Sequence, residues 1–197
     1  TMKRMTSLAC AVAVALCAGV LAGDAAVLEL FNGKDLTGWK AKGPDAKNKW
    51  KVGKAALDPA KAEHLVCTEG GNEMVNLVSK HGEGLDFYCE MKWGSATIEI
   101  EVMVPKGSNS GIYVMGEYEI QVLDGYGATR LYPGSLGGIY GAAAPKVNAA
   151  KKPGQWQRIV VELRAPRFDG GKKTANARFL KVTLNGQVIH ENLEVTG

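Results

Sequence analysis

The segment from Ala96 to Val104 constrains the fold of this chain more than any other. Its branched apolar residues, Ile98, Ile100 and Val102, share one face, and acidic residues occupy positions on the other. A period of two residues is typical of a strand that buries one face and exposes the other. A helix would instead repeat its apolar positions about every 3.6 residues. The segment therefore predicts a half-buried strand in a sheet.

Similar short runs recur along the chain between Gly, Pro and Asn residues, and no segment keeps a helical period. The other expected strands are Val27–Phe31, Lys49–Val52, His64–Cys67, Leu85–Trp93, Gly111–Met115, Tyr118–Leu123, Trp156–Arg164 and Asn176–Leu184. Asn185-Gly186 predicts a tight type I′ hairpin turn into a strand that starts at Gln187. Residues 165–173 are expected to form a solvated hairpin tip. Many short strands without helices predict an all-β domain, a β-sandwich or jelly roll.

The N-terminus has a different character from the rest of the chain. Lys3 and Arg4 precede a charge-free apolar run from Leu8 to Ala22. A run of about 15 residues after a basic start predicts a secretory signal peptide, and is shorter than the roughly 20 residues of a membrane-spanning helix. We predict a signal peptide over residues 1–23, a domain over 24–197, and a secreted or periplasmic protein without a stable membrane span. Lipid attachment at Cys17 is disfavoured by the bulky residue before it, and an uncleaved anchor is the alternative.

The charged and metal-binding residues exclude several classes of function. The formal net charge is +4, from 24 basic and 20 acidic residues, which is too balanced to indicate a nucleic-acid partner. The three His residues are scattered, and the two Cys of the predicted domain, Cys67 and Cys89, have no metal-ligand spacing. The pair is compatible with one disulfide or with two free thiols. We therefore expect no metal and no cofactor.

The long segment from Gly125 to Gly154 is rich in Gly, Ala and Pro and shows little pattern. Long loops in compact domains are usually functional or disordered. Two interpretations stay open at this stage: a loop that lines a binding cleft, with Tyr140 as a candidate lining residue, or a slack surface loop.

The most informative segment for chemistry is Tyr118–Asp124. Its apolar residues alternate with Glu119 and Gln121, so one face is expected to pack and the other to present a carboxylate beside an amide. Asp124 would fall on the packed face of a regular strand. A bulge or the end of the strand could turn it back toward Glu119. Two carboxylates and an amide on one sheet face would suit acid–base chemistry on a sugar. The alternative is an ordinary half-exposed strand.

Several motifs in order resemble one family. Phe31–Trp39 resembles the opening "LFNGKDLxGW" of the 3-keto-disaccharide hydrolase domain family, and Asn109–Tyr113 and Tyr118–Asp124 resemble its "NSGIY" and "YEIQVLD" segments. Later landmarks at Gly138–Tyr140 and Leu184–Gly186 follow in the same order. The resemblance covers roughly residues 30–197.

The resemblance implies a concanavalin A-like jelly roll that cleaves or binds oxidised sugars. The spacing of Glu119, Gln121 and Asp124 is also similar to the Glu-x-Asp-x-x-Glu strand of laminarinase-type glucanases, where the outer carboxylates are nucleophile and acid–base. Gln121 and Asp124 depart from that pattern, which argues against ordinary retaining chemistry. Members of the family generally continue beyond Val195–Gly197, so the resemblance also implies that a last strand, with a candidate catalytic His, lies outside this chain.

A 3-keto sugar makes a different mechanism available. The ketone acidifies the hydrogen on C2, a base removes it, and the group on C1 then departs before water adds. We hypothesise that Glu119 is the base, Gln121 an orienting donor and Asp124 the acid.

The candidate substrate-binding residues come from the neighbouring strand and the long loop. Asn109, Ser110 and Tyr113 are expected to hydrogen-bond sugar hydroxyls, and Tyr140 to line the cleft.

These inferences lead to an exported enzyme that cleaves 3-keto-disaccharides or 3-keto-glucosides. The first alternative is a non-catalytic carbohydrate-binding module that uses the same sheet face, and the second is a structural or adhesive surface protein. Convergence of Glu119 with Asp124 would favour the enzyme. Exposed aromatic rings without paired carboxylates would favour the binding module.

Overall fold

Antiparallel strands account for almost all regular structure in the computed structural model, which describes residues 10–18, 27–78, 80 and 83–197. Within this part of the chain the only other regular element is a short 3-10 turn, η1 (Asp45–Lys47). The principal sheet has eight strands, and three two-stranded sheets accompany it. The prediction of an all-β protein is therefore confirmed.

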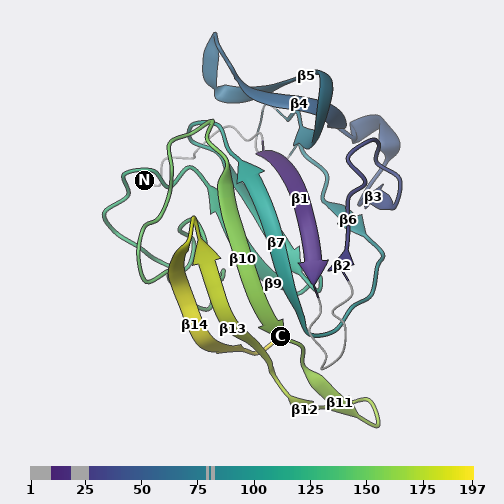
Figure 1. Cartoon of the computed structure of the whole chain (residues 1–197), viewed down its shortest axis with the longest axis vertical. Helices are drawn as coiled ribbons and strands as arrows, with labels where there is room; N and C mark the ends of the chain where they lie inside the picture. The colour runs from purple at the N-terminus through teal and green to yellow at the C-terminus, as the bar shows by residue number, and fades with distance from the viewer. Residues whose placement is uncertain (1–9, 19–26, 79, 81–82) are drawn as a thin grey trace.

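The principal sheet runs diagonally through the molecule (Figure 1). Seven of its strands follow one path, and β2 (Val27–Leu28) pairs beside β1. In spatial order the path is β14 (Gln187–Val195), β13 (Ala177–Leu184), β10 (Gln157–Arg164), β7 (Ala96–Met103), β1 (Cys10–Ala18), β5 (Lys61–Asn76) and β4 (Trp50–Asp58). The strand predicted from alternation is thus β7, an inner strand of this sheet.

The strand β1 comes from the segment predicted to be a signal peptide. It pairs along β7 from Ala11↔Met103 to Ala18↔Thr97, with an irregularity between Val14 and Cys17. Its first residues also pair with the end of β5. The rest of the predicted leader, residues 1–9 and 19–23, lies outside the described residues, as does the expected cleavage region. Where the sequence indicated a removable leader, the described part of that segment is an inner strand.

The second layer of the sandwich is the hairpin of β8 (Asn109–Val114) and β9 (Tyr118–Leu123), which pairs residue for residue. The apolar face of β9, with Ile120 and Val122, packs in one core with the inner faces of β7, β10 and β13. The Tyr118 ring meets Phe179 edge-on at 6.2 Å between centroids. Burying each such side chain contributes about 1.5–3 kcal/mol to folding. The sequence prediction that Tyr118, Ile120 and Val122 form the packed face is confirmed.

Two predicted hairpins are also present. Asn185 and Gly186 have φ values of 51° and 82° between the paired Leu184 and Gln187, as a type I′ turn requires. The expected solvated tip is the exposed pair β11 (Arg167–Asp169) and β12 (Lys172–Ala175).

The remaining short sheet joins β3 (Trp39–Ala41) to β6 (Phe87–Cys89). Cys89 lies in this sheet and Cys67 in β5, and both are free thiols. Of the two alternatives that the sequence left open, the structure therefore has free thiols rather than a disulfide. Burial raises the pKa of the Cys67 thiol, so its protonated form is favoured.

Candidate functional site

The hairpin β8–β9 places four residues in a block on one face of the sheet. Tyr113 pairs with Glu119, and Gly111 pairs with Gln121 in the next row. Residues two apart on a strand point to the same side, so the block is set by this register. A tight turn at Met115 (φ 58°) and Gly116 (φ 71°), closed by the amide of Glu117 donating to the carbonyl of Val114, holds the register.

The carboxylate of Glu119 is the centre of this block and accepts two hydrogen bonds. The Tyr113 hydroxyl donates to Oε2 at 2.9 Å, and the Gln121 amide donates to Oε1 at 3.2 Å. Gln121 is only 5% exposed, so its amide is held in place by the packing around it. The hydrogen bond to Glu119, followed by burial, raises the pKa of Tyr113, which keeps the phenol protonated as a donor. Glu119 is thus a preorganised carboxylate with one side open to the cavity.

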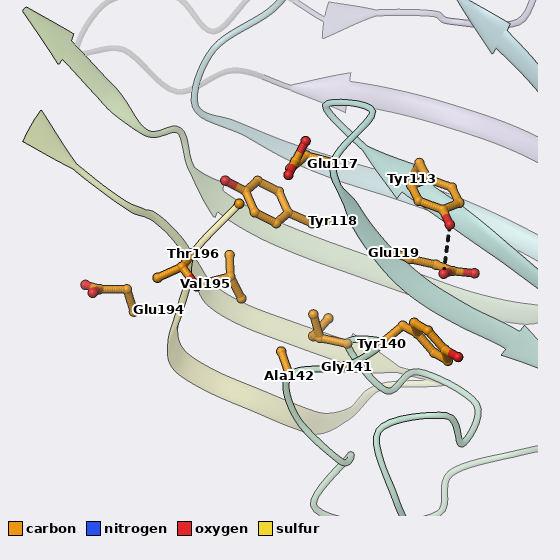
Figure 2. A pocket seen from close by; sticks show the side chains of 12 residues that line it. Tyr113, Glu117, Tyr118, Glu119, Tyr140, Gly141, Ala142, Glu194, Val195 and Thr196 are labelled. Carbon is orange, nitrogen blue, oxygen red and sulfur yellow. Dashed lines mark hydrogen bonds between the residues drawn. The ribbon is translucent and has the colours of Figure 1, made fainter. Parts of the chain in front are cut away.

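Glu119 faces a cavity of about 470 Å³, large enough for a small saccharide. Figure 2 shows the rings of Tyr113 and Tyr140 lying near Glu119, with Glu117 and Tyr118 farther along the hairpin. The Tyr113 and Tyr140 side chains are 57% and 62% exposed. Exposed aromatic rings near a carboxylate are suited to stacking against a sugar while the carboxylate acts on it.

One wall of the cavity comes from the segment that the sequence left open as either a cleft loop or a slack loop. Its residues 137–140 run beside β9, and backbone amides and carbonyls join the two. The backbone amide of Gln121 donates to the carbonyl of Gly138 at 2.9 Å, and the backbone amide of Gly137 donates to the backbone carbonyl of Gln121 at 2.8 Å. The Tyr140 amide donates to the Glu119 carbonyl at 2.9 Å. The interpretation as a slack surface loop is wrong, because Leu136 and Ile139 are buried in the main core.

Three of the predicted site residues lie away from Glu119, and two of them, Ser110 and Asn109, are on β8. Ser110 pairs with Val122, on the face opposite Tyr113. Asn109 shares the face of Tyr113 but lies two rows away, about 13 Å along the strand at 3.3 Å per residue. Neither residue lines the cavity. The structure brings together Glu119, Gln121, Tyr113 and Tyr140, but not these two.

Asp124 is also separated from Glu119. The β8–β9 register is regular throughout, without the bulge that would turn Asp124 toward Glu119. Five residues along the strand correspond to about 16 Å. The Asp124 carboxylate instead accepts hydrogen bonds from the backbone amides of Gly107 at 3.0 Å and Tyr126 at 3.3 Å. In this structure Asp124 holds the turns at the far end of the hairpin.

The cavity also contains residues that the sequence reasoning missed. These are Glu117 and Tyr118 on the hairpin, Gly141 and Ala142 on the long segment, and Glu194–Gly197 at the end of β14. Hydrogen bonds from Asn176 and Arg178 lower the pKa of Glu194 and hold its carboxylate. Gly111 was missed as well, although the pairing of NSGIY with YEIQVL would have placed it opposite Gln121. No pattern in the sequence indicated the others.

The described residues contain no cluster of three or more His, Cys, Asp or Glu side chains that could hold a metal ion. They also contain no helix with the length and apolar character needed to cross a membrane.

His190 supports the wall of the cavity from β14. It is buried, and its Nε2 donates to the carbonyl of Gly137 at 2.8 Å. Burial, assisted by the nearby Lys146 ammonium, holds the pKa of the imidazole below its usual value of 6.5. Lys146 in turn pairs with Glu191. The folded protein therefore favours a neutral His190.

This burial predicts a pH-dependent stability. Below pH 6.5 the unfolded chain binds a proton at position 190 before the folded chain does, so the free energy of unfolding falls as the pH decreases. The slope is at most about 1.4 kcal/mol per pH unit. Urea unfolding between pH 7.5 and 4.5 measures it. His190→Gln, which keeps a donor but does not titrate, is expected to flatten the dependence; an unchanged slope in this variant would contradict the assignment.

Comparison with known proteins shows the family of this chain. Residues 27–197 match the model of the 3-keto-alpha-glucoside-1,2-lyase-like domain. A crystal structure from Parabacteroides distasonis, identified provisionally as a glycosyl hydrolase, is similar with a TM-score of 0.62 and 28% sequence identity. The match covers 85% of this chain and 65% of that one, so the chain spans about two thirds of its solved relative. No curated protein matches the chain. Because the family model covers nearly all of the described sandwich, the chain belongs to the family of 3-keto-alpha-glucoside-1,2-lyase-like domains.

Proposed function

We propose that this protein cleaves 3-keto-glycosides, with Glu119 as the base. The observation that carries the proposal is the Glu119 carboxylate, held by Tyr113 and Gln121 and open to a cavity with two exposed tyrosine rings. The family supports a glycoside-cleaving activity, and the geometry supports a proton transfer that starts at one carboxylate. Retaining glycosidases instead use two carboxyl groups about 5 Å apart, and the pair predicted here does not converge.

The reaction that fits these residues is an elimination followed by hydration. The C2–H bond breaks, its proton goes to Glu119, and its electron pair forms an enolate with the 3-keto group. The C1–O bond then breaks as C1=C2 forms, and the leaving oxygen takes the phenolic proton of Tyr113. Tyr113 recovers a proton from Glu119 along their hydrogen bond. Water then adds across C1=C2 to give the free 3-keto sugar.

The other side chains have supporting roles in this proposal. Gln121 is a positioning residue that fixes the Glu119 carboxylate through its amide. Tyr140 supplies an exposed ring for the sugar. We leave Asp124 out of the reaction because backbone amides already occupy its carboxylate at the far end of the hairpin.

The proposal is tested by incubating the chain with 3-keto-glucosides and with the unoxidised parent glucosides. Only the 3-keto compounds are expected to release their alcohol, because only they have an acidic hydrogen on C2. Liquid chromatography with mass detection follows the released alcohol, the unsaturated sugar and its hydrate. Release from both series at equal rates would contradict the elimination.

A carbohydrate-binding module is the second candidate, and one observation favours it. Tyr113 and Tyr140 are exposed in the cavity, while Glu119 and Asp124 do not converge. A module of this kind would bind sugars in equilibrium dialysis without changing them, which is a distinct outcome of the same incubation.

Two further features belong to this proposal. We propose that the chain is exported, because Lys3, Arg4 and the apolar run from Leu8 to Ala22 have the composition of a leader. Since Cys10–Ala18 is also the inner strand β1, the proposal includes that this segment is retained after export rather than removed. Fractionation of cells that express the full chain checks this. We also propose that the sandwich is a concanavalin A-like jelly roll; a crystal structure of the protein would test that topology.

A further inference from the structure

Gly111 lies directly beside the side chain of Glu119. A methyl group built at Gly111 would lie 2.8 Å from both Cγ and Cδ of Glu119, and closer still to Oε1. Real Cβ atoms essentially never approach other heavy atoms this closely. The Glu119 side chain therefore occupies the space that a side chain at position 111 would fill.

The backbone at Gly111 does not itself require glycine. Gly111 is not among the residues with positive φ, and it pairs regularly with Gln121 in the hairpin. Glycine inside a strand weakens the strand and often marks a close approach of another group. Here the group is the carboxylate of Glu119, which lies diagonally across the hairpin toward β8.

We propose that Gly111 is a positioning residue for Glu119. Its missing side chain lets the carboxylate lie over β8, where the Tyr113 hydroxyl and the Gln121 amide both reach it. A residue with a Cβ displaces the carboxylate outward and breaks at least one of these hydrogen bonds. Three neighbours thus define the position of Glu119: two donors and one absent side chain. The kinetic consequence rests on the proposed role of Glu119 as base; the geometric consequence does not.

The variant Gly111→Ala is expected to fold. The atoms that meet the new methyl group belong to a flexible, partly exposed side chain rather than to backbone, so Glu119 can change rotamer. Alanine also adopts an extended backbone without strain. The substitution is therefore expected to move the Glu119 carboxylate and to leave the backbone of the hairpin unchanged.

The first measurement does not depend on turnover. Since the hydrogen bond to Glu119 is the largest cause of the raised pKa of Tyr113, displacing the carboxylate should return that pKa toward its ordinary value of 10.0. Carbon-13 NMR of labelled tyrosine rings follows the titration, with the Tyr113 signal assigned from Tyr113→Phe.

The second measurement is kinetic. On a 3-keto-glucoside, Gly111→Ala is expected to lower kcat by on the order of 10²-fold, because a base displaced by about 1 Å loses its alignment with the proton. KM is expected to change little, since the exposed rings of Tyr113 and Tyr140 remain.

Two glycines give matched controls. A methyl at Gly94 would meet nothing within 4 Å, and Gly94→Ala should behave as the unsubstituted chain. A methyl at Gly53, far along the chain in β4, would lie 2.6 Å from Cys67 Sγ, and Gly53→Ala should lower stability without moving the Tyr113 titration.

The outcomes separate the two proposals. An unchanged Tyr113 titration in folded Gly111→Ala overturns the positioning role, whatever the activity. If the titration of Tyr113 shifts in Gly111→Ala but the unsubstituted chain turns over no 3-keto sugar, the positioning role is supported and the proposed function is contradicted. A shifted titration with undiminished kcat retains the geometry but contradicts the assignment of Glu119 as base.

Discussion

Replacing Glu119 with Gln is expected to lower kcat on 3-keto-glucosides by on the order of 10²–10⁴-fold, the range for loss of a general base. Gln has nearly the same shape as Glu, and its carbonyl oxygen can still accept the hydrogen bond from Tyr113. Its amide cannot take the proton from C2, so the enolate does not form. The exposed rings of Tyr113 and Tyr140 remain, and KM is expected to stay within a few-fold. Steady-state release of an aryl leaving group measures both constants.

The matched control is Glu117→Gln, which removes a second carboxylate from the same cavity. Glu117 is exposed on the hairpin turn, and no hydrogen bond comparable to those of Glu119 holds its side chain in the described structure. We expect a much smaller loss for this variant. Equal losses in the two variants would mean that the negative charge of the cavity matters rather than proton transfer to Glu119.

Removing the N-terminal segment is expected to have the largest effect on the fold. A chain that starts at Asp24 lacks β1, so the backbone groups of β7 that pair with it, from Thr97 to Met103, lose their partners. The link between β7 and β5 in the sheet is lost as well. Each buried, unpaired backbone group costs about 1–3 kcal/mol, and an open strand edge can pair with another chain. We expect the melting temperature to fall by more than about 10 °C, or the chain to self-associate.

The control for this truncation is a chain that starts at Leu8, which retains all of β1. Thermal unfolding and light scattering compare the two chains. If both are monomeric with the same melting temperature, the pairing of β1 with β7 contributes nothing to stability, and the apolar segment is free to act as a removable leader.

Several strands were predictable because their signals are local, whereas β3 was not expected and β5 was expected only over His64–Cys67. The alternation of residues from Ala96 to Val104 is enough to predict β7. Asn185-Gly186 is enough to predict the hairpin of β13 and β14, since only a few residue types tolerate positive φ at both turn positions. The apolar run before Ala22 was ambiguous, because a short apolar segment satisfies a leader and an inner strand equally well.

Only those features of the site that follow from the alternation of side chains between the two faces of a strand could be predicted. Glu119 and Gln121 share a face because they are two residues apart, and this followed from the sequence. Asp124 required a bulge that the structure does not have, so its distance from Glu119 could not be derived from spacing alone. The relation of Gly111 to Glu119 depends on the pairing of two strands and leaves no trace in either strand by itself.

The wall formed by residues 137–140 is joined to β9 by backbone amides and carbonyls, which any residue except proline can provide. These backbone hydrogen bonds, together with the buried side chains of Leu136 and Ile139, attach the wall to the sandwich and do not involve the Tyr140 ring. The exposed side chains of Tyr140 and Ala142 can therefore be exchanged without detaching the segment, while the Glu119 carboxylate on β9 stays in place. A change of side chain at Tyr140 or Ala142 thus alters the surface that shares the cavity with Glu119, and the hairpin that holds the carboxylate need not change with it.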